Sequence, residues 1–198
     1  MRILAGALKG RRLVTPRGAV TRPTADQVRL ALMDTLAPRL PGARFLDLFA
    51  GAGGVGLEAL SRGAVHATLV ERDTRAVGAL RTNVETLGVS AAVRIRRSDA
   101  LREIAALARA GERFDVAFLD PPYETDAAGP ALAALVAGGL VAAEGVVIVQ
   151  HLTKRPPPAP AGLVAHRTRR FGETTLTFYR PAAAGEASRE RSDQGSGC

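Results

Sequence analysis

The sequence has very few cysteines, aromatic residues and histidines. Its 198 residues include one cysteine, no tryptophan and 4% aromatic residues. A single cysteine excludes a disulfide framework and any cysteine-rich zinc site. The histidines, His66, His151 and His166, lack metal-ligand spacing, so we expect no bound metal and place all three at the surface or in loops.

Long apolar runs and a signal-peptide start are also missing. No apolar stretch approaches the ~20 residues that are needed to span a bilayer, and residues 1–6 lack the apolar core of a signal peptide. Apolar residues nevertheless make up 46% of the chain, which is enough for a sizeable core. We therefore expect a cytoplasmic, monomeric protein with one compact domain and no membrane partner.

Acidic residues are absent from two stretches of the chain. Residues 1–25 hold six basic residues and residues 145–172 hold five, and neither stretch contains an acid. The net charge of +8 favours a polyanionic partner, although the predominance of arginine over lysine also points to a compositional bias. Acid-free stretches suit phosphate contacts, since each neutralised phosphate releases counterions. A pair of solvated basic loops is the alternative interpretation.

The apolar pattern alternates between strands and helices after an N-terminal stretch rich in glycine and arginine. A helix is expected to begin at Thr24 and to end before Pro38. The pattern then predicts strands at 45–49, 68–70, 93–96, 114–119, 146–150, 163–167 and 174–179, and helices at 55–61, 74–87, 100–110 and 130–136. This is an α/β fold with a mostly parallel seven-stranded sheet and helices on both faces, in which the last two strands form a hairpin.

Three segments follow from this pattern. Residues 1–23 form a basic N-terminal arm or short β-hairpin, and residues 24–180 form the main domain. Residues 181–198 are small and polar, and we expect a disordered tail there.

A glycine-rich turn follows the first strand of the main domain. Gly51, Gly53 and Gly56 form a G-x-G-x-x-G pattern between a strand and a helix, and Glu71 stands twenty residues after Gly51 at the end of the second strand. Glycines permit a tight turn and a close ligand approach, and the carboxylate can accept both hydroxyls of an adenosine ribose. The pattern by itself suits NAD equally well.

Two further acids discriminate between cofactors. Asp47 precedes the glycine turn, where it would repel a pyrophosphate but attract the ammonium group of an amino acid. S-adenosylmethionine carries such an ammonium group and no phosphate. Asp99 follows the third strand, where it can either accept from an adenine amino group or cap the next helix.

The strongest motif is Asp120-Pro121-Pro122-Tyr123, at the end of the fourth strand. The amino nitrogen of a nucleobase is a poor nucleophile, because its lone pair is delocalised into the ring. Hydrogen bonds from its N–H groups to the Asp120 carboxylate and the Pro121 carbonyl favour a pyramidal nitrogen, while the Tyr123 ring stacks on the base. Orientation and electrostatics can then carry methylation of an exocyclic amine without a metal or a covalent nucleophile.

With these motifs the chain resembles the Rossmann-like, class I S-adenosylmethionine-dependent methyltransferases, and more narrowly the bacterial 16S rRNA guanine-N2 methyltransferases of the RsmD type. The resemblance covers roughly residues 1–180. It is carried by residues 2–6, 9–13, 21–24, 46–51, 56–64, 70–73, 120–123 and 171–174. One departure is Gln150-His151, where relatives often carry an acid.

The resemblance implies methyl transfer to the N2 amine of a guanine in small-subunit rRNA, within an assembled or assembling 30S subunit. It assigns catalysis to Asp120, Pro121, Pro122 and Tyr123. It assigns the cofactor, S-adenosyl-L-methionine, to Asp47, Phe49, Ala50, Gly51, Gly53, Gly56, Glu71, Arg72, Asp99 and Ala100. It assigns RNA contacts to Arg2, Lys9, Arg11, Arg12, Arg17, Arg22 and Thr24.

Two other functions stay open at this stage. A DNA amino-methyltransferase uses the same tetrapeptide, but the short chain leaves no room for a separate target-recognition domain. A catalytically silent RNA-binding assembly factor would bind RNA in a salt-dependent way and turn over nothing.

Overall fold

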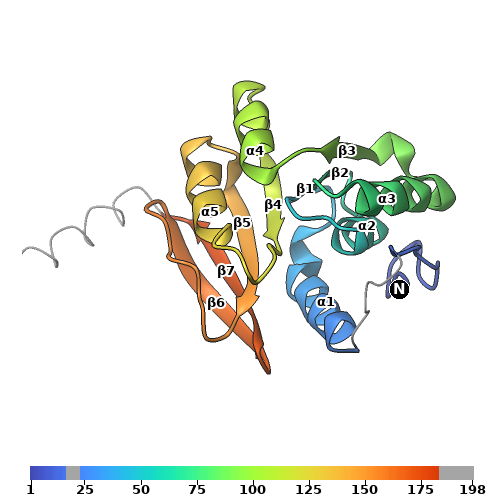
Figure 1. The fold of residues 1–198 in the computed structure, drawn as a ribbon, viewed down its shortest axis with the longest axis horizontal. Coiled ribbons are helices and arrows are strands. Elements are labelled where there is room, and N and C mark those ends of the chain that lie inside the picture. The colour runs from blue at the N-terminus through green and yellow to red at the C-terminus, as the bar shows by residue number, and fades with distance from the viewer. Residues whose placement is uncertain (17–22, 183–198) are drawn as a thin grey trace, which may run out of the picture.

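The computed structural model describes residues 1–16 and 23–182, and Figure 1 shows them as a layered α/β ribbon. The helices are α1 (Pro23–Leu36), α2 (Gly54–Ser61), α3 (Thr74–Leu87), α4 (Ala100–Arg109) and α5 (Ala128–Ala137), with short 3-10 turns at Ala37–Arg39 and Ser90–Ala92. The strands are β1 (Arg44–Asp47), β2 (His66–Glu71), β3 (Val93–Arg97), β4 (Phe114–Leu119), β5 (Val141–Leu152), β6 (Leu163–Phe171) and β7 (Thr174–Pro181).

The seven strands form one mixed sheet in the order β3-β2-β1-β4-β5-β7-β6. The first five strands in this order pair in parallel, whereas β7 runs antiparallel to both β5 and β6. The antiparallel pairing arises because only Gly172 and Glu173 connect β6 to β7, with Gly172 at a φ of 61°. The sequence-based prediction of a mostly parallel sheet ending in a hairpin is therefore confirmed.

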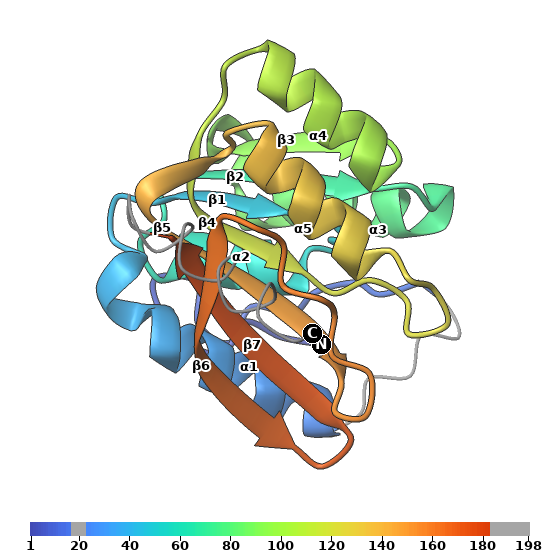
Figure 2. The same ribbon diagram turned by 90° about the vertical axis from the view of Figure 1, so that its left-hand side faces the viewer.

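Helices cover both faces of the sheet, as Figures 1 and 2 show. On one face, α1, α2 and α3 pack on a cluster that includes Phe45 and Phe118, and on the other, α4 and α5 pack on a cluster that includes Leu46 and Leu119. Neighbouring residues of one strand enter opposite clusters because side chains alternate across a strand. Burial of each such side chain stabilises the folded state by about 1.5–3 kcal/mol relative to leaving it exposed.

Several element boundaries differ from the sequence-based prediction. The fifth strand is twelve residues long and begins at Val141, five residues earlier than predicted, because Val141 pairs with Phe114 before a β-bulge. Helix α5 begins at Ala128 instead of Pro130, since a proline is tolerated in the first helical turn. Helix α1 begins at Pro23, one residue earlier than predicted.

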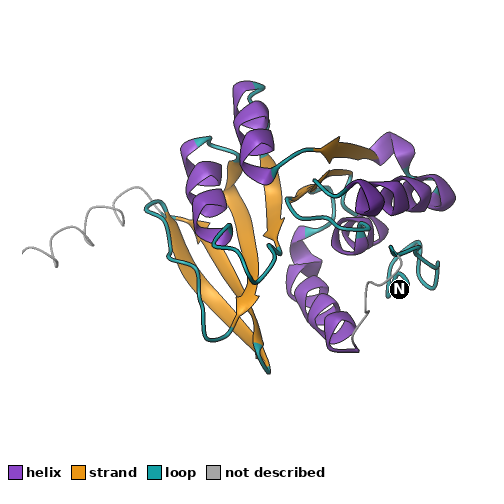
Figure 3. Ribbon diagram, viewed as in Figure 1, coloured by secondary structure: helices purple, strands orange, loops and turns teal. Residues whose placement is uncertain are grey.

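The N-terminal segment, residues 1–16, lies as a loop beside α2 and α3 (Figure 3). One antiparallel bridge, between Arg2 and Arg12, closes it. Its Ile3 and Leu13 are buried in the same cluster as α1, α2 and α3, so this segment completes the core of the main domain. Within the described residues no helix is long and apolar enough to cross a membrane.

Candidate active site

The carboxyl ends of the parallel strands bring most of the predicted site residues to one edge of the sheet. A cavity of about 260 Å³ lies over β2, β3 and β4, and the predicted residues that line it are Phe49, Glu71, Arg72, Asp99, Ala100, Asp120 and Pro122. A second cavity, of about 240 Å³, lies over β1, and the predicted residues that line it are Asp47, Phe49, Ala50, Gly51 and Asp120. The two cavities share Phe49 and Asp120, and together they suit an elongated ligand.

Two of the predicted cofactor glycines line neither cavity. Gly53, at a φ of 89°, is the N-cap of α2, and a Cβ on it would stand 2.5 Å from Leu80. A Cβ on Gly56 would stand 2.2 Å from the Leu69 side chain. Both glycines therefore let α2 pack closely against its neighbours, which is a structural requirement of this turn.

Glu71 holds the glycine turn through its carboxylate. One oxygen accepts a hydrogen bond from the Gly51 amide at 2.8 Å, and the other accepts from the Asp73 amide at 2.8 Å. Each oxygen retains a further lone pair for a ligand hydroxyl. Asp99 is the N-cap of α4 and accepts from the Leu101 amide at 2.9 Å, so the capping interpretation is correct and the residue also faces the 260 Å³ cavity.

Two carboxyl groups, the buried Asp47 and the half-buried Asp120, lie close to the junction of the cavities. Burial raises the pKa of Asp47 to about 8, and the neighbouring Asp120 and Glu71 add to this shift. Burial also raises the pKa of Asp120 to about 7. A cation placed here would favour the ionised form of both groups, which makes this junction a preferred position for positive charge.

The Asp120–Tyr123 tetrapeptide leads away from this junction. The Pro122 carbonyl accepts from the Thr125 amide at 3.0 Å, whereas the Pro121 carbonyl accepts no hydrogen bond among the described residues. Gln150 Nε2 donates to the Tyr123 hydroxyl at 3.2 Å, which fixes the ring. The ring lines a third, largely apolar cavity of about 370 Å³ together with Pro121 and residues 156–158.

The predicted RNA residues are only partly described. Arg2, Lys9, Arg11 and Arg12 are exposed on the N-terminal segment. Arg17 and Arg22 lie outside the described residues, and so does the side chain of Thr24.

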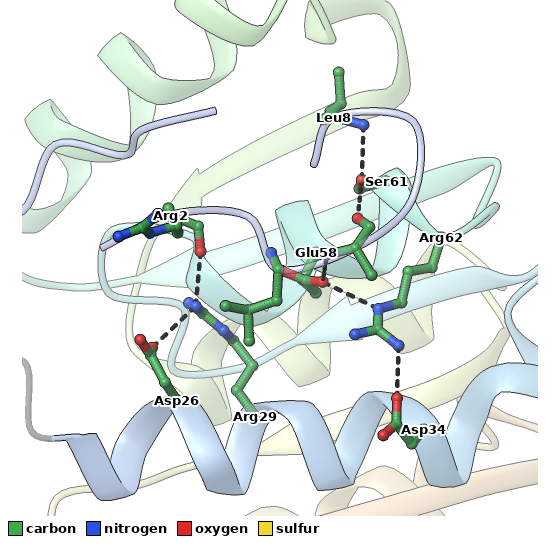
Figure 4. Close-up of polar contacts among 10 residues, drawn as sticks. Arg2, Leu8, Asp26, Arg29, Asp34, Glu58, Ser61 and Arg62 are labelled. Carbon is green, nitrogen blue, oxygen red and sulfur yellow. Dashed lines mark hydrogen bonds and ion pairs between the residues drawn. The ribbon is translucent and has the colours of Figure 1, made fainter. Parts of the chain in front are cut away.

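Sequence reasoning missed the residues of α2 that hold this segment in place (Figure 4). The fully buried Glu58 accepts from the amides of Leu4 at 2.7 Å and Ala5 at 2.9 Å. Ser61 Oγ accepts from the Leu8 amide at 2.9 Å and donates to the Ala5 carbonyl at 2.6 Å. A charged residue on the apolar stripe of an expected helix was the available signal, because a buried acid needs partners.

The N-terminal segment is also tied to the glycine turn. The buried Asn83 of α3 accepts from the Val14 amide at 2.7 Å, and its amide group donates to the carbonyls of Val14 and Ala52, each at 2.9 Å. One side chain thus joins the basic segment to the turn that lines the 240 Å³ cavity.

The expectation of surface histidines is wrong for His151. This residue is buried in the sheet, with its two ring nitrogens 2.8 Å from the Leu152 carbonyl and 2.8 Å from Thr177 Oγ1. The error arose because β5 extends past residue 150 and pairs there with β7, a contact that local sequence does not show.

Fold and site together define a Rossmann-like α/β protein with its candidate ligand site at the carboxyl ends of parallel strands. The SAM-dependent methyltransferase from Agrobacterium tumefaciens shares this fold, with a TM-score of 0.60 at 16% identity over 81% of this chain and 63% of that one. Residues 1–180 match the family model described as Conserved hypothetical protein 95, and the chain belongs to this family.

Two similar proteins from Escherichia coli make the relationship more specific. The ribosomal RNA small subunit methyltransferase D of strain K12 is 36% identical over 188 residues, which cover 94% of this chain and 93% of that protein. The solved structure of yhhF has a TM-score of 0.82 at 34% identity and covers 93% of this chain and 99% of that one. The resemblance to the RsmD-type family that the sequence motifs indicated is therefore confirmed.

Proposed function

We propose that this protein transfers a methyl group from S-adenosyl-L-methionine to the exocyclic N2 amine of a guanine in small-subunit (16S) rRNA. The observation that carries this proposal is the position of Asp120. This residue directly follows β4 at the junction of two cavities, and next to it lie a Pro121 carbonyl without a hydrogen bond to the described residues and the Tyr123 ring, which Gln150 holds.

The residues present fit the cofactor. The 260 Å³ cavity offers Glu71 for ribose hydroxyls and Asp99 for an adenine amino group, and Phe49 lines it as an apolar wall. The 240 Å³ cavity offers the Asp47 carboxylate for the ammonium group of the methionine moiety. Bound there, S-adenosylmethionine supplies an electrophilic methyl group on a sulfonium centre.

The chain's own residues prepare the nucleophile. The Asp120 carboxylate and the Pro121 carbonyl accept the two N–H groups of the guanine amine, so that its lone pair turns toward the methyl group. Tyr123 holds the base by stacking. The methylated nitrogen must lose one proton, and Asp120, with a pKa near neutrality, is placed to accept it.

The substrate's phosphates are the proposed partners of the exposed cations Arg2, Lys9, Arg11 and Arg12. The same proposal includes the assembled or assembling 30S subunit as the substrate, a monomeric protein and a cytoplasmic location. It also includes the segment boundaries at residues 23 and 180. A DNA amino-methyltransferase is disfavoured because the family relatives that match nearly the whole chain are rRNA enzymes by name.

The test is label transfer from S-adenosylmethionine to 30S subunits that lack this modification, followed by mapping of the modified nucleotide. Asp120→Asn keeps the shape of the side chain but loses the anionic acceptor, so we expect a rate at least about 100-fold lower. The wild-type kcat/KM for S-adenosylmethionine, which reports groups of the free enzyme, should rise with pH through about 7, as Asp120 ionises.

Glu124→Gln is the matched control, because Glu124 directly follows the tetrapeptide, is exposed and lines none of the three cavities. It should leave the rate unchanged. Label that appears only in DNA would support the alternative enzyme, and tight, salt-dependent RNA binding without any label would support a silent assembly factor.

A further inference from the structure

Arg29 of α1 is a buried arginine that uses only one of its three nitrogens to hydrogen-bond to the described residues. Its Nη2 donates to the Arg2 carbonyl at 2.8 Å and to Asp26 Oδ1 at 3.0 Å (Figure 4). The side chain is 5% exposed, and its Nε is buried with no hydrogen-bond partner among the described residues. An unsatisfied buried donor on a charged group is costly, so a partner at this position would be favourable.

The 240 Å³ cavity lies against this guanidinium. Arg29 lines it together with Asp47, Asp120 and the first turn of α2. A Cβ on Gly54, the first residue of α2, would stand 3.1 Å from Arg29 Nη1, so the side chain reaches the start of this helix. The first-turn amides of a helix lack intrahelical partners and favour an anion, and Arg29 adds a full positive charge beside them.

The cavity therefore offers charges of both signs to one ligand. Asp47 presents a carboxylate that suits an ammonium group, whereas Arg29 and the start of α2 suit a carboxylate. An α-amino acid carries these two groups on a single carbon. Asp26 also lines the cavity, but its half-exposed carboxylate is paired with Nη2 of the same arginine.

We propose that Arg29 binds the carboxylate of the methionine moiety of S-adenosylmethionine, opposite the ammonium group held by Asp47. This inference rests on the proposed cofactor and adds a binding residue that the sequence motifs did not indicate. Arg29 then has two roles, because Nη2 holds the N-terminal segment while Nη1, which lies close to the start of α2, is left to bind the ligand carboxylate.

The test compares ligands with and without the carboxylate by isothermal titration calorimetry. S-adenosylmethionine is measured against decarboxylated S-adenosylmethionine, which lacks only that group. The wild type should bind the complete molecule about 10- to 100-fold more tightly, as expected for hydrogen bonds between charged groups. In Arg29→Met this preference should vanish, with little change in affinity for the decarboxylated ligand, and Arg29→Lys should restore part of it.

Arg62→Met is the matched control. Arg62 is also largely buried, pairs with Glu58 and Asp34, and has an unpartnered Nη2, but it does not line the cavity. This variant should lose stability while it keeps the wild-type preference for the carboxylate.

The outcomes separate the two proposals. A wild type that binds neither ligand contradicts the proposed function itself. A wild type that binds both ligands equally well, or an Arg29→Met protein that keeps the preference or weakens both ligands to the same extent, overturns the role of Arg29. If Arg29→Met fails to fold, as judged by circular dichroism, Arg29→Lys decides: the preference for the carboxylate should be smaller than in the wild type, and a preference equal to that of the wild type would overturn the role of Arg29.

Discussion

At the scale of single residues, the site is defined by carboxyl groups that the fold holds out of water. Asp47 and Asp120 stand at adjacent strand ends, where burial raises the pKa of both. Such groups lower the stability of the ligand-free protein, and in their ionised form they can bind a cationic group. Functional sites commonly hold groups with shifted pKa values for this reason.

Asp47 should make the free protein less stable as the pH rises. Its carboxyl stays protonated up to about pH 8 in the folded chain, but it ionises near pH 4 in the unfolded chain. The folded state thus binds more protons between these values, so the free energy of unfolding falls as pH rises from about 4 to about 8. Asp47→Asn should therefore stabilise the apo protein at pH 8.5, by about 1–3 kcal/mol in urea unfolding, and much less at pH 4.5.

The same substitution should remove measurable affinity for S-adenosylmethionine in calorimetry. Asp126→Asn, at an exposed carboxylate, serves as the control. An Asp47→Asn protein whose stability relative to wild type did not depend on pH would contradict a protonated Asp47 in the folded apo state.

At the scale of elements, α2 links the cofactor turn to the N-terminal segment. Its first turn faces the cavity, whereas Glu58 and Ser61 on its other side hold the backbone of residues 4–8. Gly6 permits this contact, since a Cβ on it would stand 1.8 Å from the Ser61 carbonyl oxygen. These hydrogen bonds hold in place the backbone that carries the exposed basic side chains of the segment.

Glu58→Gln should loosen the N-terminal segment. A glutamine offers one oxygen and an amide donor where two backbone amides and Arg62 Nε require acceptors. We expect a loss of about 2–4 kcal/mol in the free energy of unfolding and faster hydrogen exchange at the amides of Leu4 and Ala5. Glu85→Gln, at an exposed position of α3, should change neither quantity. Unchanged protection of Leu4 and Ala5 would show that Glu58 is not their main acceptor.

At the scale of the whole molecule, the basic N-terminal segment is attached to the part of the fold that carries the candidate site. The N-terminal segment packs on the α1, α2 and α3 face, and Asn83 connects it to the turn beside the cofactor cavity. Positive charge close to the cavities would bring an RNA backbone toward Asp120.

Removal of one cation from this segment should weaken RNA binding in a salt-dependent way. For Arg12→Gln we expect the slope of log affinity against log salt to become shallower by about 0.7–0.9, the value for one lost phosphate contact. Fluorescence anisotropy with small-subunit rRNA fragments measures this slope. Arg109→Gln is the control, because Arg109 is exposed on α4, which covers the opposite face of the sheet. Equal slopes for the two variants would argue against RNA contacts by the N-terminal segment.

The order and type of the elements can be predicted from the sequence, because apolar periodicity and glycine turns are local signals. The sequence also placed Asp47, Glu71 and Asp120 at strand ends, since each directly follows apolar residues, and it offered Asp99 as the cap of the next helix. Which of these residues share a cavity depends on strand order and register, so the folded structure is needed to see it. The folded structure alone shows that Arg29, Glu58 and Asn83 face inward, and that His151 is buried. The N-terminal backbone groups that bond to Arg29, Glu58 and Asn83 stand 27 to 69 residues away in the chain, and Thr177, which contacts His151, stands 26 residues away, beyond the reach of any local pattern.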